Sequence, residues 1–122
     1  MSSHLGVILL VIGVYTAAAL PQFFAPRLLL ARVTFGVETS EPLTLLFARH
    51  WALLAALVGG LLVYSVYHPE VRVPAMCIAI VEKFALAGLI FFGEWKRTPA
   101  ASRLGALDVA MGVVLLLCLG GL

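Results

Sequence analysis

The stretch PAMCIAIVEKFALAGLIFFG, residues 74–93, decides the fold, because it is apolar and about as long as one bilayer crossing at 1.5 Å per residue. It carries an acid and a base, Glu82 and Lys83, next to each other near its middle. A charged side chain at the centre of a membrane helix costs about 2.5–3.5 kcal/mol on insertion scales. We therefore expect both side chains to face protein or water, sheltered from lipid by the rest of the chain.

The composition of the chain indicates an integral membrane protein. Of its 122 residues, 63% are apolar and 11% are charged, and the mean hydropathy is +1.13, whereas globular proteins are about 25% charged. The length leaves room for about four crossings and none for a separate soluble domain, so we expect a single domain, residues 1–122. The basic residues form no run with interleaved aromatics, so nucleic acid is not an expected partner.

Four apolar segments are expected to cross the membrane as helices in an antiparallel, all-α bundle. They are residues about 5–24, 44–67, 74–93 and 102–120. Pro21 is expected to kink or end the first helix. Pro26 suits a first helical position and Gly36 suits a stop, so the sequence between them predicts a short interfacial helix.

Small residues recur at four-residue spacing in the second and fourth segments, which lets a neighbouring backbone approach closely. The rows are Ala52, Ala56 and Gly60, then Ala55 and Gly59, and in the fourth segment Ala106 and Ala110. We expect these faces to pack on neighbouring helices, including those of a homo-oligomer.

Charges in the short connections predict the orientation through the positive-inside rule. The connections after the first and third segments carry Arg27, Arg32, Lys96, Arg97 and Arg103. The connection after the second segment carries only Arg72. Both termini are therefore expected outside, in the periplasmic direction, with the protein in the inner (plasma) membrane.

Depth along the helices brings further polar residues near the acid and base of the third segment. We take the inner ends of the helices as one common level, the inner floor. At 1.5 Å per residue, Arg49 and Asp108 lie roughly 7–8 Å from this floor, so we expect them to form an ion pair. Lys83 lies about 15 Å from that floor, and its long stem can reach toward Asp108. With His50 and Glu82 these residues form a predicted polar ladder. The ladder is either a proton or ion path or a pocket for a lipophilic head group, or else a set of ties between helices.

Two cysteines, Cys77 and Cys118, fall in the outer halves of their helices. Antiparallel packing allows them to form a thiol pair if their Cα atoms come within about 7 Å. Alternatively, each behaves as a small apolar residue. The chain has no CxxC and no Cys/His spacing typical of a metal site, so neither a metal nor another cofactor is expected.

Four motifs resemble those of the DoxX-like group of small four-helix bacterial membrane proteins. They are the proline-broken ALPQFFAPRLLL, the small-residue ARHWALLAALVGGLLVYSVYHPE, the lysine of VEKFALAGL and the acid of LGALDVAMG. The resemblance covers most of the chain. It implies a subunit or partner of a membrane redox system, or a helper in the assembly of other membrane proteins. The lack of a CxxC argues against a dithiol oxidoreductase.

No catalytic residues can be named, because no nucleophile with an orienting base, metal triad or oxyanion motif accompanies Glu82 and His50. The sequence therefore favours a non-enzymatic protein that acts through contacts within the bilayer, as an accessory subunit, assembly factor or small lipophile-binding protein. Its expected partners are membrane lipids and another membrane protein or a second copy of itself. One alternative is a membrane-embedded redox or quinone-linked enzyme component that uses the ladder and the cysteines. Another is a small proton-coupled transporter.

Overall fold

The computed structural model describes residues 2–93 and 98–121, and within these ranges the chain is helical, with no β-strand. The helices in chain order are α1 (Ser2–Ala17), α2 (Pro21–Phe24), α3 (Pro26–Leu29), the π-helix η1 (Leu30–Thr34), α4 (Pro42–Tyr67), the 3₁₀-helix η2 (Pro69–Val71), α5 (Arg72–Phe92) and α6 (Pro99–Gly120).

Four helical spans are long and apolar enough to cross a membrane, which confirms the expectation of a helical chain with four candidate crossings and agrees with a multi-pass membrane protein. They are His4–Phe24, Pro42–Tyr67, Pro69–Phe92 and Pro99–Gly120. The first span contains both α1 and α2, because the chain turns at residues 18–20 before Pro21 opens α2. Prolines also open α4 and α6, at Pro42 and Pro99, so both helices begin slightly before their predicted starts.

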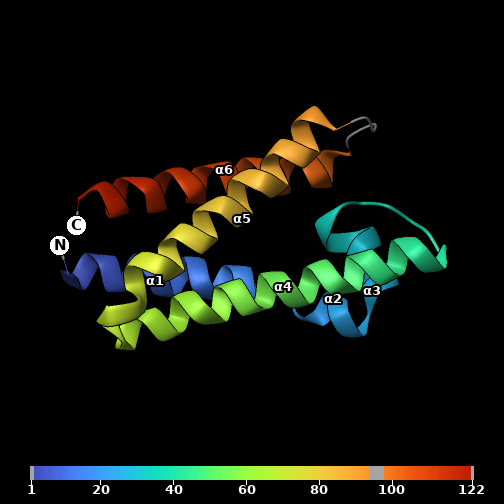
Figure 1. The fold of residues 1–122 in the computed structure, drawn as a ribbon. Helices are drawn as coiled ribbons and strands as arrows, with labels where there is room; N and C mark the ends of the chain where they lie inside the picture. Colours follow the sequence, from blue (N-terminus) through green and yellow to red (C-terminus); the bar gives the residue numbers. More distant parts are fainter. Residues whose placement is uncertain (1, 94–97, 122) are drawn as a thin grey trace.

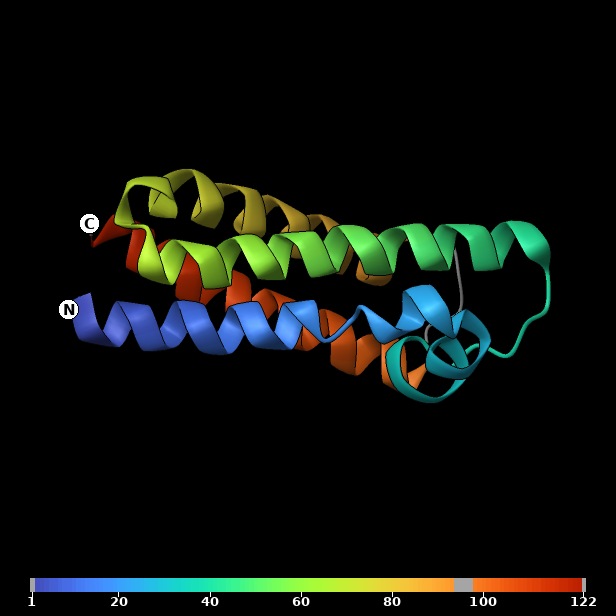
Figure 2. The same ribbon diagram turned by 90° about the horizontal axis from the view of Figure 1, so that it is seen from below.

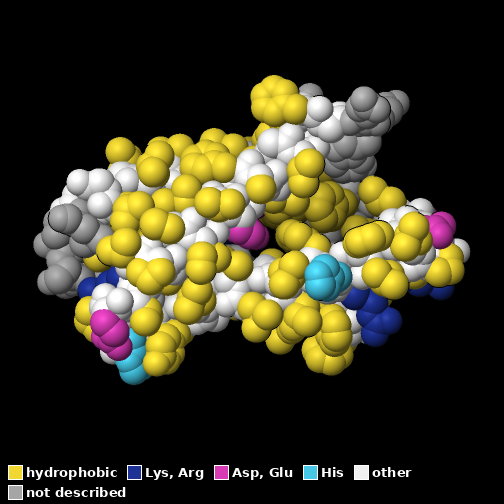
Figure 3. All heavy atoms as spheres, in the orientation of Figure 1, with side chains coloured by type: hydrophobic (Ala, Val, Ile, Leu, Met, Phe, Trp, Pro, Cys, Tyr) yellow, Lys and Arg dark blue, Asp and Glu magenta, His cyan; other side chains and the backbone are white. Residues whose placement is uncertain are grey.

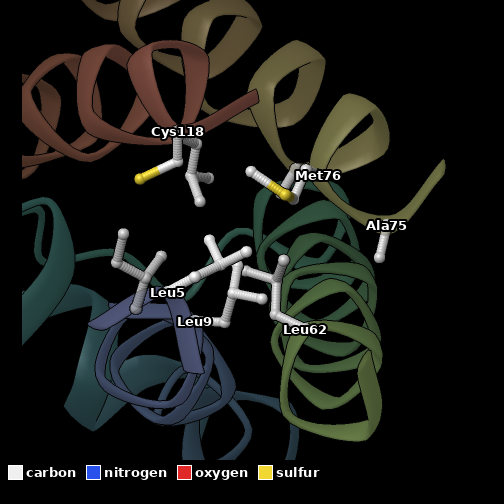
Figure 4. Close-up of a cluster of buried hydrophobic side chains, with 9 residues drawn as sticks. Leu5, Leu9, Leu62, Ala75, Met76 and Cys118 are labelled. Carbon is white, nitrogen blue, oxygen red and sulfur yellow. The ribbon is translucent and has the colours of Figure 1, made fainter. Parts of the chain in front are cut away.

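The helices pack as a bundle built from two pairs (Figures 1 and 2). α1 lies along α4 and α5 lies along α6, while α4 also contacts α5. The two termini lie at the same end of the molecule. Near that end a buried apolar cluster draws on all four long helices, and it includes Leu9 from α1, Leu62 from α4, Met76 from α5 and Cys118 from α6 (Figure 4).

α1 and α4 approach each other closely because both carry a glycine at the crossing. A Cβ atom added to Gly59 would lie 2.5 Å from the carbonyl oxygen of Gly13 and 2.9 Å from the Cα atom of Ala17. Such distances are far below van der Waals contact, so only a residue without a side chain fits. The backbone contact therefore depends on this pair of glycines.

Of the other small residues at four-residue spacing, some are buried in the bundle and others are exposed on its surface. On α4, Ala52 and Ala55 are buried with Gly59, whereas Gly60 is exposed and a Cβ added there would meet no atom within 4 Å. On α6, Ala106 and Ala110 are exposed. The expectation that every row packs on a neighbouring helix is therefore wrong within this chain, because the buried face of α6 carries Gly105 and Gly112 against aromatic rings instead.

The segment between α2 and α4 contains the predicted short helix in two parts. α3 passes directly into η1, whose π-helical turns are rare in proteins and often occur at functional sites. η1 ends at Thr34, shortly before Gly36, whose φ of +68° lies in the left-handed region that favours glycine. The proline start and the glycine stop are therefore where the sequence suggested.

α4 begins with a side-chain cap that makes it sensitive to pH. The Glu41 carboxylate accepts hydrogen bonds from the Thr44 N–H (2.7 Å), the Thr44 hydroxyl (2.8 Å) and the Leu43 N–H (3.1 Å). These bonds favour the ionised form, and the bond from the Thr44 N–H contributes most to holding the pKa of Glu41 below its usual value.

We expect the cap to be intact above the ordinary pKa of glutamate and to be lost as the pH falls through the lowered pKa of Glu41. A carboxyl-carbon NMR titration should report that pKa, and the amide signals of Leu43 and Thr44 should move with the same midpoint. In Glu41→Gln those amide signals should lose this transition. An unchanged transition in Glu41→Gln would show that another group caps the helix.

Candidate functional site

A cavity of about 250 Å³ lies inside the bundle, at the end where α1 stops and α6 begins. The lining residues are Tyr15 and Thr16 of α1, Ala18 and Ala19 of the following turn, Val33 and Thr34 of η1, Trp51 and Ala55 of α4, Glu82 and Lys83 of α5, and Ala100, Arg103, Leu104, Leu107 and Asp108 of α6. The cavity therefore gathers Glu82, Lys83 and Asp108 of the predicted ladder in an otherwise largely apolar wall.

Lys83 ties three helices together at this cavity. Its side chain is 1% exposed, and its Nζ donates a hydrogen bond to the Thr16 hydroxyl at 2.8 Å. The same Nζ lies 3.6 Å from Asp108 Oδ1. Thr16 in turn donates to the Ile12 carbonyl at 2.7 Å. The predicted approach of Lys83 to Asp108 is therefore present, and Thr16 is a further partner that the sequence did not suggest.

Arg49 and His50 lie outside this cavity, so the predicted ion pair of Arg49 with Asp108 is wrong. The Arg49 Nε donates to the Phe23 carbonyl at 2.9 Å, and its guanidinium lies 5.6 Å from the centre of the Phe23 ring. The His50 side chain is exposed. At this height α4 packs on α2, so Arg49 meets the chain just after Pro21 and not α6.

Three buried polar atoms on the cavity-lining residues have no hydrogen-bond partner within residues 2–93 and 98–121. They are Glu82 Oε2, Asp108 Oδ2 and Trp51 Nε1, and we call them the orphan atoms. Each unmade hydrogen bond of this kind costs about 1–3 kcal/mol. The cavity has several times the roughly 30 Å³ that one water occupies in the liquid, so it has room for polar groups larger than one water. Glu82 therefore faces a space that can accept a hydrogen-bond donor.

One side of the cavity is closed by the segment from α2 to η1, residues 21–35, which we call the roof. Gln22 is fully buried and donates to the Ala48 carbonyl of α4 at 3.0 Å, while it accepts a hydrogen bond from Thr34 of η1. At the far end of the roof, the Thr98 hydroxyl donates to the Phe35 carbonyl. The roof is thus hydrogen-bonded to α4 at one end and to the start of α6 at the other.

The acidic interior reaches the apolar side of the molecule. Figure 3 shows an acidic side chain in a hollow between α4 and α5, bordered mostly by hydrophobic side chains. A side surface of this composition would face the lipid chains when the four spans cross a membrane. The site is therefore placed to meet molecules dissolved in the bilayer.

Sequence reasoning missed most of the uncharged polar residues of the site. Tyr15 and Thr16 interrupt an otherwise apolar helix, which is a signal that could have marked the buried face of α1. Trp51 directly follows His50, and Thr34 lies in the predicted short helix. Gln22 could have been suspected because it is the one amide between Pro21 and the phenylalanines that follow it.

The two cysteines do not form the predicted thiol pair in the described part of the chain. Both thiols are free. Cys77 is exposed on the outside of α5, whereas Cys118 is buried in the apolar cluster (Figure 4). The surroundings of Cys118 agree with the alternative that it packs as a small apolar residue.

The resemblance to the DoxX-like group stays a prediction. No protein-family model matches the chain, and neither a curated protein nor a solved structure matches it.

Proposed function

We propose that this chain is a multi-pass protein of the inner (plasma) membrane that binds a small lipophilic molecule, whose polar head occupies the cavity between α1, α5 and α6. The observation that carries the proposal is the meeting of three orphan atoms at one cavity inside an apolar bundle. The role is binding, and no residue is assigned to catalysis.

The size and chemistry of the cavity both favour a head group as its occupant. At about 250 Å³ the cavity is slightly smaller than the roughly 300–1,000 Å³ of ordinary ligand pockets. A ligand that donates to the carboxyl groups of Glu82 and Asp108 would satisfy two of the three orphan atoms, and one that also accepts from the Trp51 indole would satisfy all three. Each hydrogen bond made in this way removes a cost that the free protein carries.

The ladder then has two roles at once. Lys83 holds α1 and α6 to α5 through Thr16 and Asp108, which fixes the walls of the cavity. The Oδ2 atom of Asp108 and the Oε2 atom of Glu82 stay available to the ligand. The same residues can therefore form a binding pocket and tie the helices together.

In this proposal the bundle is antiparallel, the roof lies at the inner membrane interface, and both termini lie outside. The single basic residue of the α4–α5 connection, Arg72, donates to the carbonyls of Ser65 and Val66 at 2.8 and 2.7 Å. Arg72 caps the end of α4, so its position has a structural explanation. It therefore does not weaken the orientation argument, which rests on the excess of basic residues in the other connections. Of the basic residues on the other side, Lys96 and Arg97 lie outside the described residues.

Among the roles expected from the sequence, the cavity favours lipophile binding over the redox alternative. That alternative relied on a thiol pair, and Cys77 and Cys118 face different surroundings. An accessory role toward another membrane protein is compatible with ligand binding, and the exposed Ala106 would be available to such a partner.

Replacing Glu82 by leucine should remove the bound lipophile without lowering the unfolding temperature. Leucine fills a similar volume and takes away both the acceptor and the cost of a buried, unpaired carboxyl group. Trp51→Phe keeps the ring and loses only the N–H, so a head group that accepts from this N–H should bind about tenfold more weakly, equivalent to about 1.4 kcal/mol. Solvent extraction and mass spectrometry of protein purified in mild detergent would measure lipophile per mole of protein.

The matched control is Glu70→Leu, which neutralises an exposed acid in η2, away from the cavity. It should retain the wild-type amount of lipophile. Equal amounts in the wild type, Glu82→Leu and Glu70→Leu would contradict the proposed function.

A further inference from the structure

A second cavity, of about 320 Å³, lies between α1 and α6. Its lining is entirely apolar and includes Val7, Val11 and Ile12 of α1 and Ala110 and Val114 of α6. Several of these side chains are exposed at the surface, with Val7 61% and Val11 62% exposed. The cavity is therefore a groove that opens toward the surroundings of the bundle.

This groove and the polar cavity lie on the same faces of the same two helices. Val11 and Ile12 precede Tyr15 and Thr16 by four residues, which places each pair one above the other on a helix. On α6, Ala110 follows Leu107 of the polar cavity by three residues. The two cavities are therefore neighbours along α1 and α6, and we call the strip that contains both of them the α1–α6 seam.

The seam is polar at one end and apolar at the other. From Val7 to Thr16 it extends over about 13 Å at 1.5 Å per residue. This is the shape and polarity of an amphiphile with one hydrocarbon chain.

We propose that the ligand is a single-chain amphiphilic amine that lies along the α1–α6 seam, with its ammonium group at Glu82 and Asp108 and its hydrocarbon chain between Val11 and Ala110. This inference rests on the proposed function and names the chemical class of the ligand. The ammonium donates to the two orphan carboxyl oxygens, and the chain covers apolar surface that α1 and α6 leave open.

An amine is favoured because the acidic groups buried at the site outnumber the basic ones. Glu82 and Asp108 contribute two acids, whereas Lys83 is the one base among the buried and half-buried lining residues and is already bonded to Thr16 and Asp108. A cationic head would pair with Glu82, and the aromatic ring of Trp51 in the wall also attracts cations. Arg103 lines the cavity as well, but its side chain is exposed, where water and salt screen its charge.

The test uses a dodecylamine derivative with a photoreactive diazirine at the end of its chain, added to the whole protein in phosphatidylcholine nanodiscs. We expect light to label peptides that contain Val7 and Val11 and peptides that contain Ala110 and Val114. Unlabelled dodecylamine should compete at least tenfold better than dodecanol or dodecyl sulfate. Glu82→Gln, which keeps the shape and removes the negative charge, should reduce labelling at least tenfold.

A matched pair of variants tests the path of the chain. Ala110→Phe fills the groove and should also reduce labelling at least tenfold, whereas Ala106→Phe is exposed one turn away on α6, lines neither cavity and should have no effect. Both positions are exposed, so neither change disturbs the core.

The outcomes separate this inference from the proposed function. If Glu82→Gln abolishes labelling while Ala110→Phe does not, or if dodecanol competes as well as dodecylamine, the cavity binds a lipophile but the amine in the seam is wrong. If labelling is spread around the outside of all four helices and ignores Glu82→Gln, both the inference and the proposed function are wrong.

Discussion

Replacing Lys83 by methionine should lower the free energy of unfolding in detergent by about 3–5 kcal/mol, the cost of breaking a buried ion pair from one side. Methionine fills the space of the lysine stem, so the loss comes from the charge and not from a cavity. Asp108, which is 3% exposed, would keep a buried acid with no base beside it, and Thr16 would lose the donor that holds it to α5. Thermal or denaturant unfolding in one detergent measures the change.

The double variant Lys83→Met/Asp108→Leu is the control for this prediction. Replacing both members of a buried pair by apolar residues is often neutral or stabilising, so the double variant should recover most of the lost stability. If Lys83→Met leaves insertion, stability and ligand binding unchanged, the ladder is neither a structural tie nor part of a site.

Gly59→Ala should destabilise the bundle by about 3 kcal/mol or more, at or above the upper end of the usual cost of overpacking. The added methyl would meet backbone atoms of α1, the Gly13 oxygen and the Ala17 Cα atom, which cannot rotate away as a side chain can. α1 would have to move off α4, and the wall of the cavity that carries Thr16 would move with it. Both the unfolding temperature and the retained lipophile should fall.

Gly60→Ala, one residue further along α4, gives the matched control. A Cβ atom there meets nothing within 4 Å, so the change should be neutral or stabilise by up to about 1 kcal/mol through helix propensity. Equal effects of Gly59→Ala and Gly60→Ala would mean that the close approach of α1 to α4 is absent in the folded protein.

The helices could be predicted from the sequence because their signals are local. Long apolar runs bounded by prolines and glycines mark each span, and Gly36 marks the end of the short helix by a conformation that few other residues adopt. The sequence did not reveal which small residues are inside. Gly59 and Gly60 are neighbours with the same composition around them, and only the direction in which α4 faces α1 distinguishes them.

The site could be predicted only in part, because the position of a residue along a helix gives its depth in the membrane but not the direction in which its side chain points. The reach of Lys83 toward Asp108 followed from height and a long side chain. The prediction that Arg49 lies at the depth of Asp108 assumes that all helices begin at the same level in the membrane. The roof packs back on α4, however, and the Phe23 carbonyl accepts a hydrogen bond from Arg49. Thr16 is marked in the sequence as a polar residue in an apolar helix, but only the assembled helices show that Thr16 and Trp51 line the cavity with Glu82 and Lys83.

If the cavity holds a ligand as proposed, the attachment of the roof at both ends restricts the routes by which that ligand can leave. Gln22 fixes one end to α4 and Thr98 fixes the other, and Thr98 also accepts a hydrogen bond from the Ala101 N–H that starts α6. Lifting the roof would therefore break a hydrogen bond to the residue that caps the helix carrying Asp108. Departure sideways breaks none of these bonds, so the residence time of a ligand depends on the surrounding lipid. The concentration that governs its occupancy is its mole fraction in the bilayer and not its concentration in water.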